Sequence, residues 1–88
     1  MNQKDAEYPM RCVIIDPNGS EVMPGIGGIA PPKSIPHIGK HGIAERVSGS
    51  MSPRITLDDG AVLRGYECWW IPEDEWRQVR QDLGLPVA

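Results

Sequence analysis

The chain has 88 residues with a formal net charge of −3, and 40% of its residues are hydrophobic. A chain of this length has room for one hydrophobic core, so we expect a single domain spanning residues 1–88. The 10 glycines and 9 prolines favour many turns and short strands, and they argue against a helical bundle.

The chain shows no sign of a targeting or membrane segment. Residues 1–8 lack the apolar core of a signal peptide, and no stretch approaches the roughly 20 apolar residues that cross a membrane. Cys12 and Cys68 each lie in an apolar run, which is typical of buried reduced thiols; a disulfide between them is the alternative. We therefore expect a cytoplasmic protein without a membrane partner.

Charge is unevenly distributed along the chain. Residues 33–66 carry five basic and three acidic side chains, whereas residues 67–88 carry two and five. Binding through nucleic-acid phosphates usually requires a clear basic excess. The overall balance therefore argues against nucleic acid, but the basic middle keeps it as an alternative partner.

The first half predicts a hairpin followed by a long loop. Residues 1–9 are expected to form a flexible tail, and residues 10–23 a β-hairpin that turns at residues 17–20 (Pro-Asn-Gly-Ser) and returns along residues 21–23. Residues 24–42 have neither the helical nor the strand period, which predicts a loop. Its isoleucines lead us to expect that parts of this loop lie on the rest of the domain.

Residues 43–70 predict the strands of a small barrel. Strands are expected at residues 43–47 and 54–58, and Asp58-Asp59-Gly60 predicts a tight turn in which Gly60 takes a positive φ. The following strand, residues 61–70, contains Gly65 near its middle. That glycine predicts a bulge or a sharp bend.

The carboxy-terminal segment predicts a short acidic helix over residues 72–83. Pro72 suits the first helical position, and Gly84 with Pro86 suits the end. An apolar stripe is expected to cover the barrel, and the polar positions are expected to face water. The stripe comprises Trp76, Val79 and Leu83, and the water-facing set comprises Glu73, Asp74, Arg77, Gln78 and Gln81.

Three segments within residues 38–70 together resemble the strand-turn-strand series of SH3-like and KOW-like small β-barrels. These are Ile38–Val47, Arg54–Gly60 with its Asp-Asp-Gly turn, and Ala61–Trp70. The resemblance implies a mainly β fold, an SH3-like antiparallel barrel with a long Gly/Pro-rich loop and a short C-terminal α-helix. Barrels of this kind tend to bind peptides, nucleic acid or larger subunits.

Four of the five aromatic residues fall within eleven positions, which makes them the candidate partner-binding residues: Tyr66, Trp69, Trp70 and Trp76. Trp69 and Trp70 are consecutive, so in a strand they point to opposite faces. One interpretation is that one tryptophan and Tyr66 line an aromatic groove for a proline-rich or extended peptide, as in SH3 domains. The other is that Trp70 fills the barrel and the helix covers Trp69.

Arg46, Arg54 and Arg64 are expected on adjacent strands, where they could share one outward face beside an exposed tryptophan. A basic face next to a stacking platform is suited to single-stranded nucleic acid. The alternative is a solvated sheet surface on which these arginines pair with Glu45, Asp58 and Glu67.

The sequence predicts neither a metal site nor a catalytic site. His37, His41, Cys12 and Cys68 are ligand types that zinc accepts, but no C-x-x-C knuckle holds a pair of them together. No serine, cysteine or aspartate has a convincing base partner. We therefore expect no cofactor and no enzymatic activity.

The functional hypothesis from the sequence is a small protein-interaction module, an accessory or regulatory factor with a protein or peptide partner. A KOW-like nucleic-acid-binding protein is the alternative. Exposed strand edges can pair between two copies of a chain, so the sequence does not distinguish a dimer from a monomer.

Overall fold

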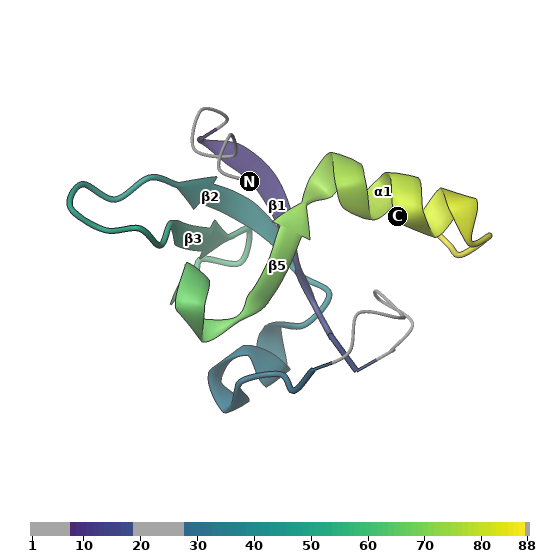
Figure 1. Cartoon of the computed structure of the whole chain (residues 1–88), viewed down its shortest axis with the longest axis horizontal. Helices are drawn as coiled ribbons and strands as arrows, with labels where there is room; N and C mark the ends of the chain where they lie inside the picture. Colours follow the sequence, from purple (N-terminus) through teal and green to yellow (C-terminus); the bar gives the residue numbers. More distant parts are fainter. Residues whose placement is uncertain (1–7, 19–27, 88) are drawn as a thin grey trace.

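A computed structural model of the chain describes residues 8–18 and 28–87. Within them the chain is mainly β, with a five-stranded antiparallel half-barrel sheet and a short carboxy-terminal helix (Figure 1). In chain order the elements are β1 (Met10–Ile15), the 3-10 helix η2 (Pro32–His37), β2 (His41–Glu45), β3 (Arg54–Leu57), β4 (Val62–Arg64), the 3-10 helix η3 (Gly65–Glu67), β5 (Trp69–Pro72) and α1 (Glu73–Asp82).

Strand β1 lies near the middle of a sheet ordered β4-β3-β2-β1-β5. It pairs with β2 on one edge, with Cys12 opposite Gly42, and with β5 on the other, with Ile14 opposite Trp70. Both edges of β1 are therefore occupied by strands from later in the chain. The return strand that the sequence predicts at residues 21–23 lies outside the described residues.

The inner face of the sheet holds the main core. Cys12, Ile14, Ala44, Ile55, Leu57, Leu63 and Cys68 are buried there in one cluster. These residues alternate with outward-facing neighbours along each strand, which is the period expected when one face of a strand is buried. Trp70 is half-buried and packs against the same cluster.

Gly65 divides the long strand that the sequence predicts over residues 61–70. The chain turns through η3 there, and the main-chain N–H of Gly65 donates to the Pro53 carbonyl at 2.9 Å. A Cβ at this position would lie 2.6 Å from Pro53 Cδ, so only glycine permits the approach. The bend ends β4 at Arg64 and starts β5 at Trp69, which lets the two strands occupy opposite edges of the sheet.

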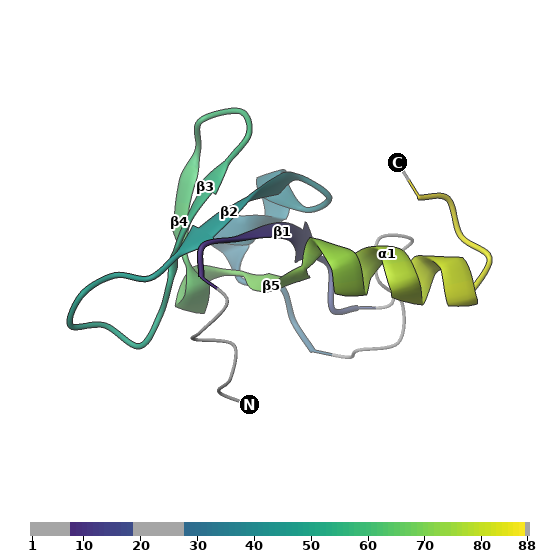
Figure 2. The same ribbon diagram turned by 90° about the horizontal axis from the view of Figure 1, so that it is seen from above.

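Helix α1 covers the outer face of the sheet over β1 and β5. Trp76 is buried with Val13 and Ile15, and Val79 packs against the same group. Leu83, the third member of the predicted apolar stripe, is 55% exposed because the helix ends at Asp82 and extends beyond the sheet (Figure 2). The helix and the β3–β4 hairpin lie at opposite ends of the molecule (Figures 1 and 2).

The loop predicted over residues 24–42 is partly ordered into η2, and β2 begins at its last two residues, His41 and Gly42. Of its described isoleucines, Ile38 packs against the main core, whereas Ile29 and Ile35 are exposed. No helix among residues 8–18 and 28–87 is long and apolar enough to cross a membrane.

Gly42 provides a test of the close approach between β2 and β3. A Cβ at this position would lie 2.5 Å from the Thr56 carbonyl oxygen and 2.8 Å from Leu57 Cα. We expect Gly42→Ala to lower the free energy of unfolding by about 1–3 kcal/mol, because backbone atoms must move. Urea unfolding followed by tryptophan fluorescence measures this.

Val62→Ala is the control, because Val62 is 54% exposed on the outer face of β4. Its expected effect is within about 0.5 kcal/mol. Equal stabilities of Gly42→Ala and wild type would contradict the close approach.

Candidate functional site

The structure separates the four predicted aromatic residues. Trp76 is only 5% exposed, and its side chain lies between α1 and the sheet. There its ring meets the His41 ring edge-on, with the two centroids 5.1 Å apart. The guanidinium of Arg80 lies 5.2 Å from the centroid of the same ring. Trp76 therefore joins the helix to the sheet, and no partner can reach its ring.

Trp69 and Trp70 point to opposite faces of β5, as their adjacent positions require. Trp69 is 39% exposed and does not lie under the helix; its indole N–H donates to the Ile29 carbonyl at 3.2 Å. The same ring lies so close to Gly28 that a Cβ there would be 3.1 Å from Cζ2. Trp69 thus holds residues 28–29 against the sheet, while Trp70 faces the main core.

A groove of about 320 Å³ opens beside Trp70, between the start of the described chain and the turn that follows β2. Tyr8 and Arg46 form one side of it, and Val47 with residues 50–53 forms the other. The Tyr8 ring contacts the Trp70 ring with centroids 6.4 Å apart. We call this feature the Tyr8 groove.

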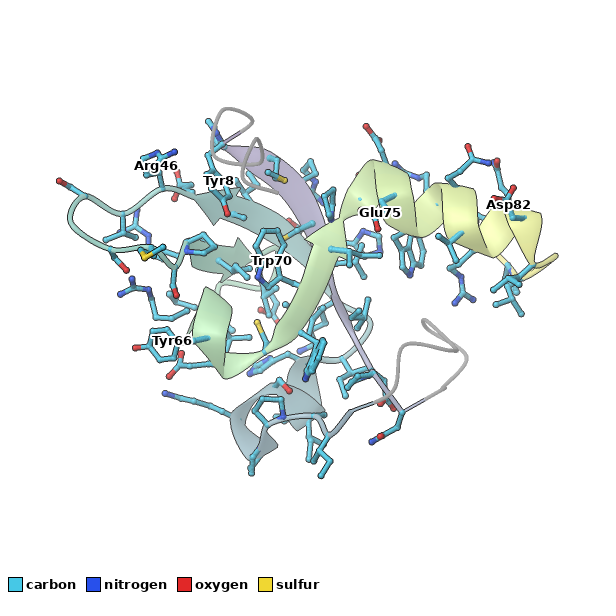
Figure 3. All side chains as sticks on the ribbon, viewed as in Figure 1. Tyr8, Arg46, Tyr66, Trp70, Glu75 and Asp82 are labelled. Atoms are coloured by element: carbon cyan, nitrogen blue, oxygen red, sulfur yellow. The ribbon has the colours of Figure 1, made fainter. Side chains whose placement is uncertain are left out.

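Tyr66 lies near this groove, beyond Pro53. Its side chain is 69% exposed on η3, and η3 is held against Pro53 by the hydrogen bond from Gly65. Figure 3 shows Tyr8, Arg46 and Tyr66 in the half of the molecule away from α1, with Trp70 nearer its centre. Of these aromatic side chains, Tyr8 lines the groove, and Trp70 contacts the Tyr8 ring from the main core.

Sequence reasoning missed Tyr8, because residues 1–9 read as a flexible tail. The signal was the position of Tyr8 and Pro9 immediately before β1. Because β1 pairs with a strand on each side, it also holds the residues next to it in place. Once β1 pairs with β5 along Ile14 and Trp70, Tyr8 comes to Trp70.

The three candidate arginines do not form one uniform face. Arg54 and Arg64 are directly opposite each other on β3 and β4, whereas Arg46 follows the end of β2 and lies over the Tyr8 ring, 5.8 Å from its centroid. Arg54 pairs with Glu45 at 3.2 Å. The Arg64 guanidinium instead holds the turn of residues 50–53, donating to the Ser50 hydroxyl at 2.8 Å, the Ser52 carbonyl at 3.1 Å and the Pro53 carbonyl at 3.4 Å.

Glu73 forms a second polar cluster, at the junction of β5 and α1. The sequence predicts a water-facing Glu73, but its side chain is only 11% exposed because the outer face of β1 and β2 supplies it with cationic and hydrogen-bonding partners. Glu73 Oε2 contacts His41 Nδ1 at 2.7 Å and Arg11 Nη2 at 3.4 Å, and Oε1 accepts from Arg77 at 3.1 Å. The hydrogen bond with His41, followed by the charges of Arg77 and Arg11, holds the pKa of Glu73 below its usual range.

The Glu73 cluster is a structural junction between sheet and helix. Arg11 also forms a two-pronged pair with Asp58, with both distances 2.8 Å, and this pair lowers the pKa of the Asp58 carboxyl. His41 is fixed between Glu73 and the Trp76 ring. The contacts of Glu73 with Arg11 and His41 thus hold α1 against β1 and β2.

The cysteines and histidines considered for zinc do not come together. Cys12 and Cys68 are free thiols within the main core, and burial raises the pKa of each to about 12. His41 lies on the other face of the sheet against Trp76. Within residues 8–18 and 28–87, no three His, Cys, Asp or Glu side chains are placed to share a metal ion.

Comparison of the chain with protein-family models, with curated proteins and with solved structures finds no match. The functional argument therefore depends on the geometry of the Tyr8 groove itself.

The Glu73 cluster predicts a defined pH dependence of stability. Because the pKa of Glu73 is lower in the folded chain than in the unfolded chain, its contribution is complete above the ordinary value of 4.5 and is lost as pH falls through the lowered pKa. We expect Glu73→Gln to cost about 1–3 kcal/mol at neutral pH and to flatten the decline of stability below pH 4.5.

The measurement is urea unfolding at a series of pH values from neutral to acid. Glu75→Gln is the matched control, because Glu75 lies two residues after Glu73 on α1 and its side chain is exposed. We expect this control to keep the wild-type slope. A Glu73→Gln variant with an unchanged acid slope would refute the assigned role of the carboxylate.

Proposed function

We propose that the protein is a small interaction module that binds an extended peptide in the Tyr8 groove. The observation that carries the proposal is the recess of about 320 Å³ that is lined by Tyr8, whose ring contacts Trp70 of the main core. Aromatic surfaces of this kind suit extended and proline-containing peptides, because such ligands lose little conformational entropy when they lie along rigid rings.

The fold supports the same class of protein. The first strand pairs with the last, so the five antiparallel strands curl into a half-barrel around one core, and this arrangement is the basis for placing the chain among SH3-like barrels. The two cysteines are free and buried, which supports a cytoplasmic location, where thiols stay reduced.

The groove is too small to accept a folded surface. Its volume accommodates one or two side chains, so the ligand is a short segment. Non-catalytic recognition is the activity that such a site supports best.

Nucleic-acid binding by Arg46, Arg54 and Arg64 is the weaker candidate. Phosphate binding draws on cations that are available to several consecutive phosphates. Arg54 is paired with Glu45, and Arg64 is hydrogen-bonded to the turn of residues 50–53, so the three do not present a continuous track.

Peptide binding predicts which surface responds in solution. Addition of proline-rich peptide pools to ¹⁵N-labelled protein should shift the amide signals of Val47 and residues 50–53 and the indole signal of Trp70. We expect Met51→Ser and Tyr66→Ala each to weaken binding about 3- to 10-fold, because each removes apolar contact area worth about 1 kcal/mol.

Val62→Ser is the matched control, since Val62 is an exposed apolar residue on the outer face of the sheet. It should leave binding unchanged. Shifts confined to the Val62 face, or no shifts with any peptide pool, would refute the proposal.

A further inference from the structure

We infer that the peptide site continues from the Tyr8 groove along residues 8–11 to the first turn of α1, where Asp74 pairs with a lysine or arginine of the peptide. This inference rests on the proposed function, because it gives the length of the ligand and the charge at one of its ends for the same site.

The first observation is a series of recesses that share their lining residues. A second recess, of about 290 Å³, shares Tyr8 and Arg46 with the Tyr8 groove. A third, of about 160 Å³, shares Pro9 with the second, and a fourth, of about 200 Å³, shares Met10 and Arg11 with the third. The four recesses therefore follow the chain in order from Tyr8 and form one path over the surface.

The path leads from the β2 side of β1 to its β5 side. The Tyr8 groove lies beside the turn that follows β2, whereas the fourth recess is lined by residues 72–74, where β5 passes into α1. Cys12 is opposite Pro72 in the β1–β5 ladder, so the chain after Pro72 runs back beside Met10 and Arg11. The two ends of the path are thus fixed by strands that pair with β1.

The length of the path matches an extended ligand. A strand rises about 3.3 Å per residue, so Tyr8 and Arg11 are roughly 10 Å apart along the chain, and the recess at each end adds to this. An extended peptide of about six residues reaches from the Tyr8 groove to the fourth recess. A peptide bound to the Tyr8 groove alone would leave the rest of the path empty.

The third recess gives the path an apolar middle. Pro9, Met10 and Ile43 line it together with Arg11, which is directly opposite Ile43 across the β1–β2 ladder. Ile43 is 39% exposed, so an aliphatic ligand side chain placed here removes apolar surface from water. The Arg11 guanidinium is already paired with Asp58 at 2.8 Å, and this pair compensates its charge beside the recess.

Asp74 is the carboxylate that a ligand can reach at the far end. Its side chain is fully exposed, and among the described residues it pairs with Arg77 at 4.0 Å. Arg77 lies closer to Glu73, at 3.1 Å. Glu73 lines the same recess, but its carboxylate is only 11% exposed and already contacts Arg11 and His41. A cationic ligand residue therefore complements Asp74, with which its ammonium or guanidinium forms a charge-assisted hydrogen bond.

Three fluorescein-labelled libraries of six-residue peptides test the inference. All are proline-rich and degenerate at the central positions, carry no terminal charge, and have lysine, glutamine or glutamate at both end positions. Binding is measured by fluorescence anisotropy at low ionic strength. We expect the lysine library to bind wild type about three- to fivefold more tightly than the glutamine library, as an exposed ion pair allows, and the glutamate library to bind most weakly.

Two variants assign that preference to the far end of the path. Asp74→Asn should reduce the preference for lysine to less than about 1.5-fold, because it removes the carboxylate and keeps the side-chain size. Glu75→Gln is the matched control: it removes one charge from the same turn of α1, and Glu75 is exposed but does not line the fourth recess. It should keep most of the preference.

A third variant tests the middle of the path. Ile43→Ser should weaken all three libraries about threefold and leave the preference for lysine unchanged, because it removes apolar contact and no charge. With ¹⁵N-labelled wild type, the lysine library should shift the amide signals of Ile43 and Asp74 together with those of residues 50–53. The amide spectra of the free variants show whether each one still folds.

The outcomes separate this inference from the proposed function. If the lysine and glutamine libraries bind equally and Met51→Ser weakens both, the Tyr8 groove stands and its continuation to Asp74 is overturned. Equal loss of the preference in Asp74→Asn and Glu75→Gln would also overturn it, since general attraction to the acidic helix would then explain the binding. If no library binds, the proposed function itself fails.

Discussion

The pairing and burial of β1 is the constraint on which the rest of the structure depends. Cys12, Val13, Ile14 and Ile15 are at most 1% exposed, and both edges of the strand are hydrogen-bonded, to β2 and β5. A strand buried on both faces needs two separate covers. The half-barrel supplies one, around Cys12 and Ile14, and α1 supplies the other, over Val13 and Ile15. Because β5 leads directly into α1, a single chain segment completes the sheet and covers its outer face.

This division into two faces also separates the two polar clusters. On the outer face, Glu73 pairs with Arg11 of β1 and Arg77 of α1 and hydrogen-bonds with His41 of β2, so its buried carboxylate joins the helix to the sheet. At the open end of the half-barrel, the Arg64 guanidinium donates to neutral groups of the 50–53 turn, and the Arg64 main-chain N–H donates to the Glu67 carboxylate. The Glu73 side chain is only 11% exposed within its cluster, whereas the 50–53 turn that Arg64 holds lines the open Tyr8 groove. Function is therefore better sought at the Tyr8 groove than at the Glu73 cluster.

Sequence patterns located most strands and the helix, because their signals are local. Alternation marks β3, the Asp-Asp-Gly turn places the β3–β4 hairpin, and the acidic first turn with Gly84 bounds α1 within one residue at each end. The patterns did not show that Gly65 divides a strand in two, since the need for glycine there comes from Pro53, twelve residues earlier. The burial of Glu73 was equally hidden: its partners Arg11 and His41 are distant in sequence and meet it only when β1, β2 and α1 converge. The aromatic cluster was visible, but its division into core and surface depends on which side of β5 each ring faces.

Arg64 illustrates how one side chain can serve structure and recognition together. Its hydrogen bonds fix a turn containing Gly49, Ser50 and Ser52, a composition that would otherwise favour a mobile loop. A fixed turn gives the groove a defined wall, so a bound peptide loses less conformational freedom on the protein side. The same guanidinium lies 5.8 Å from the centroid of the exposed Tyr66 ring. The hydrogen bonds of Arg64 thus join the end of β4 to the wall of the groove.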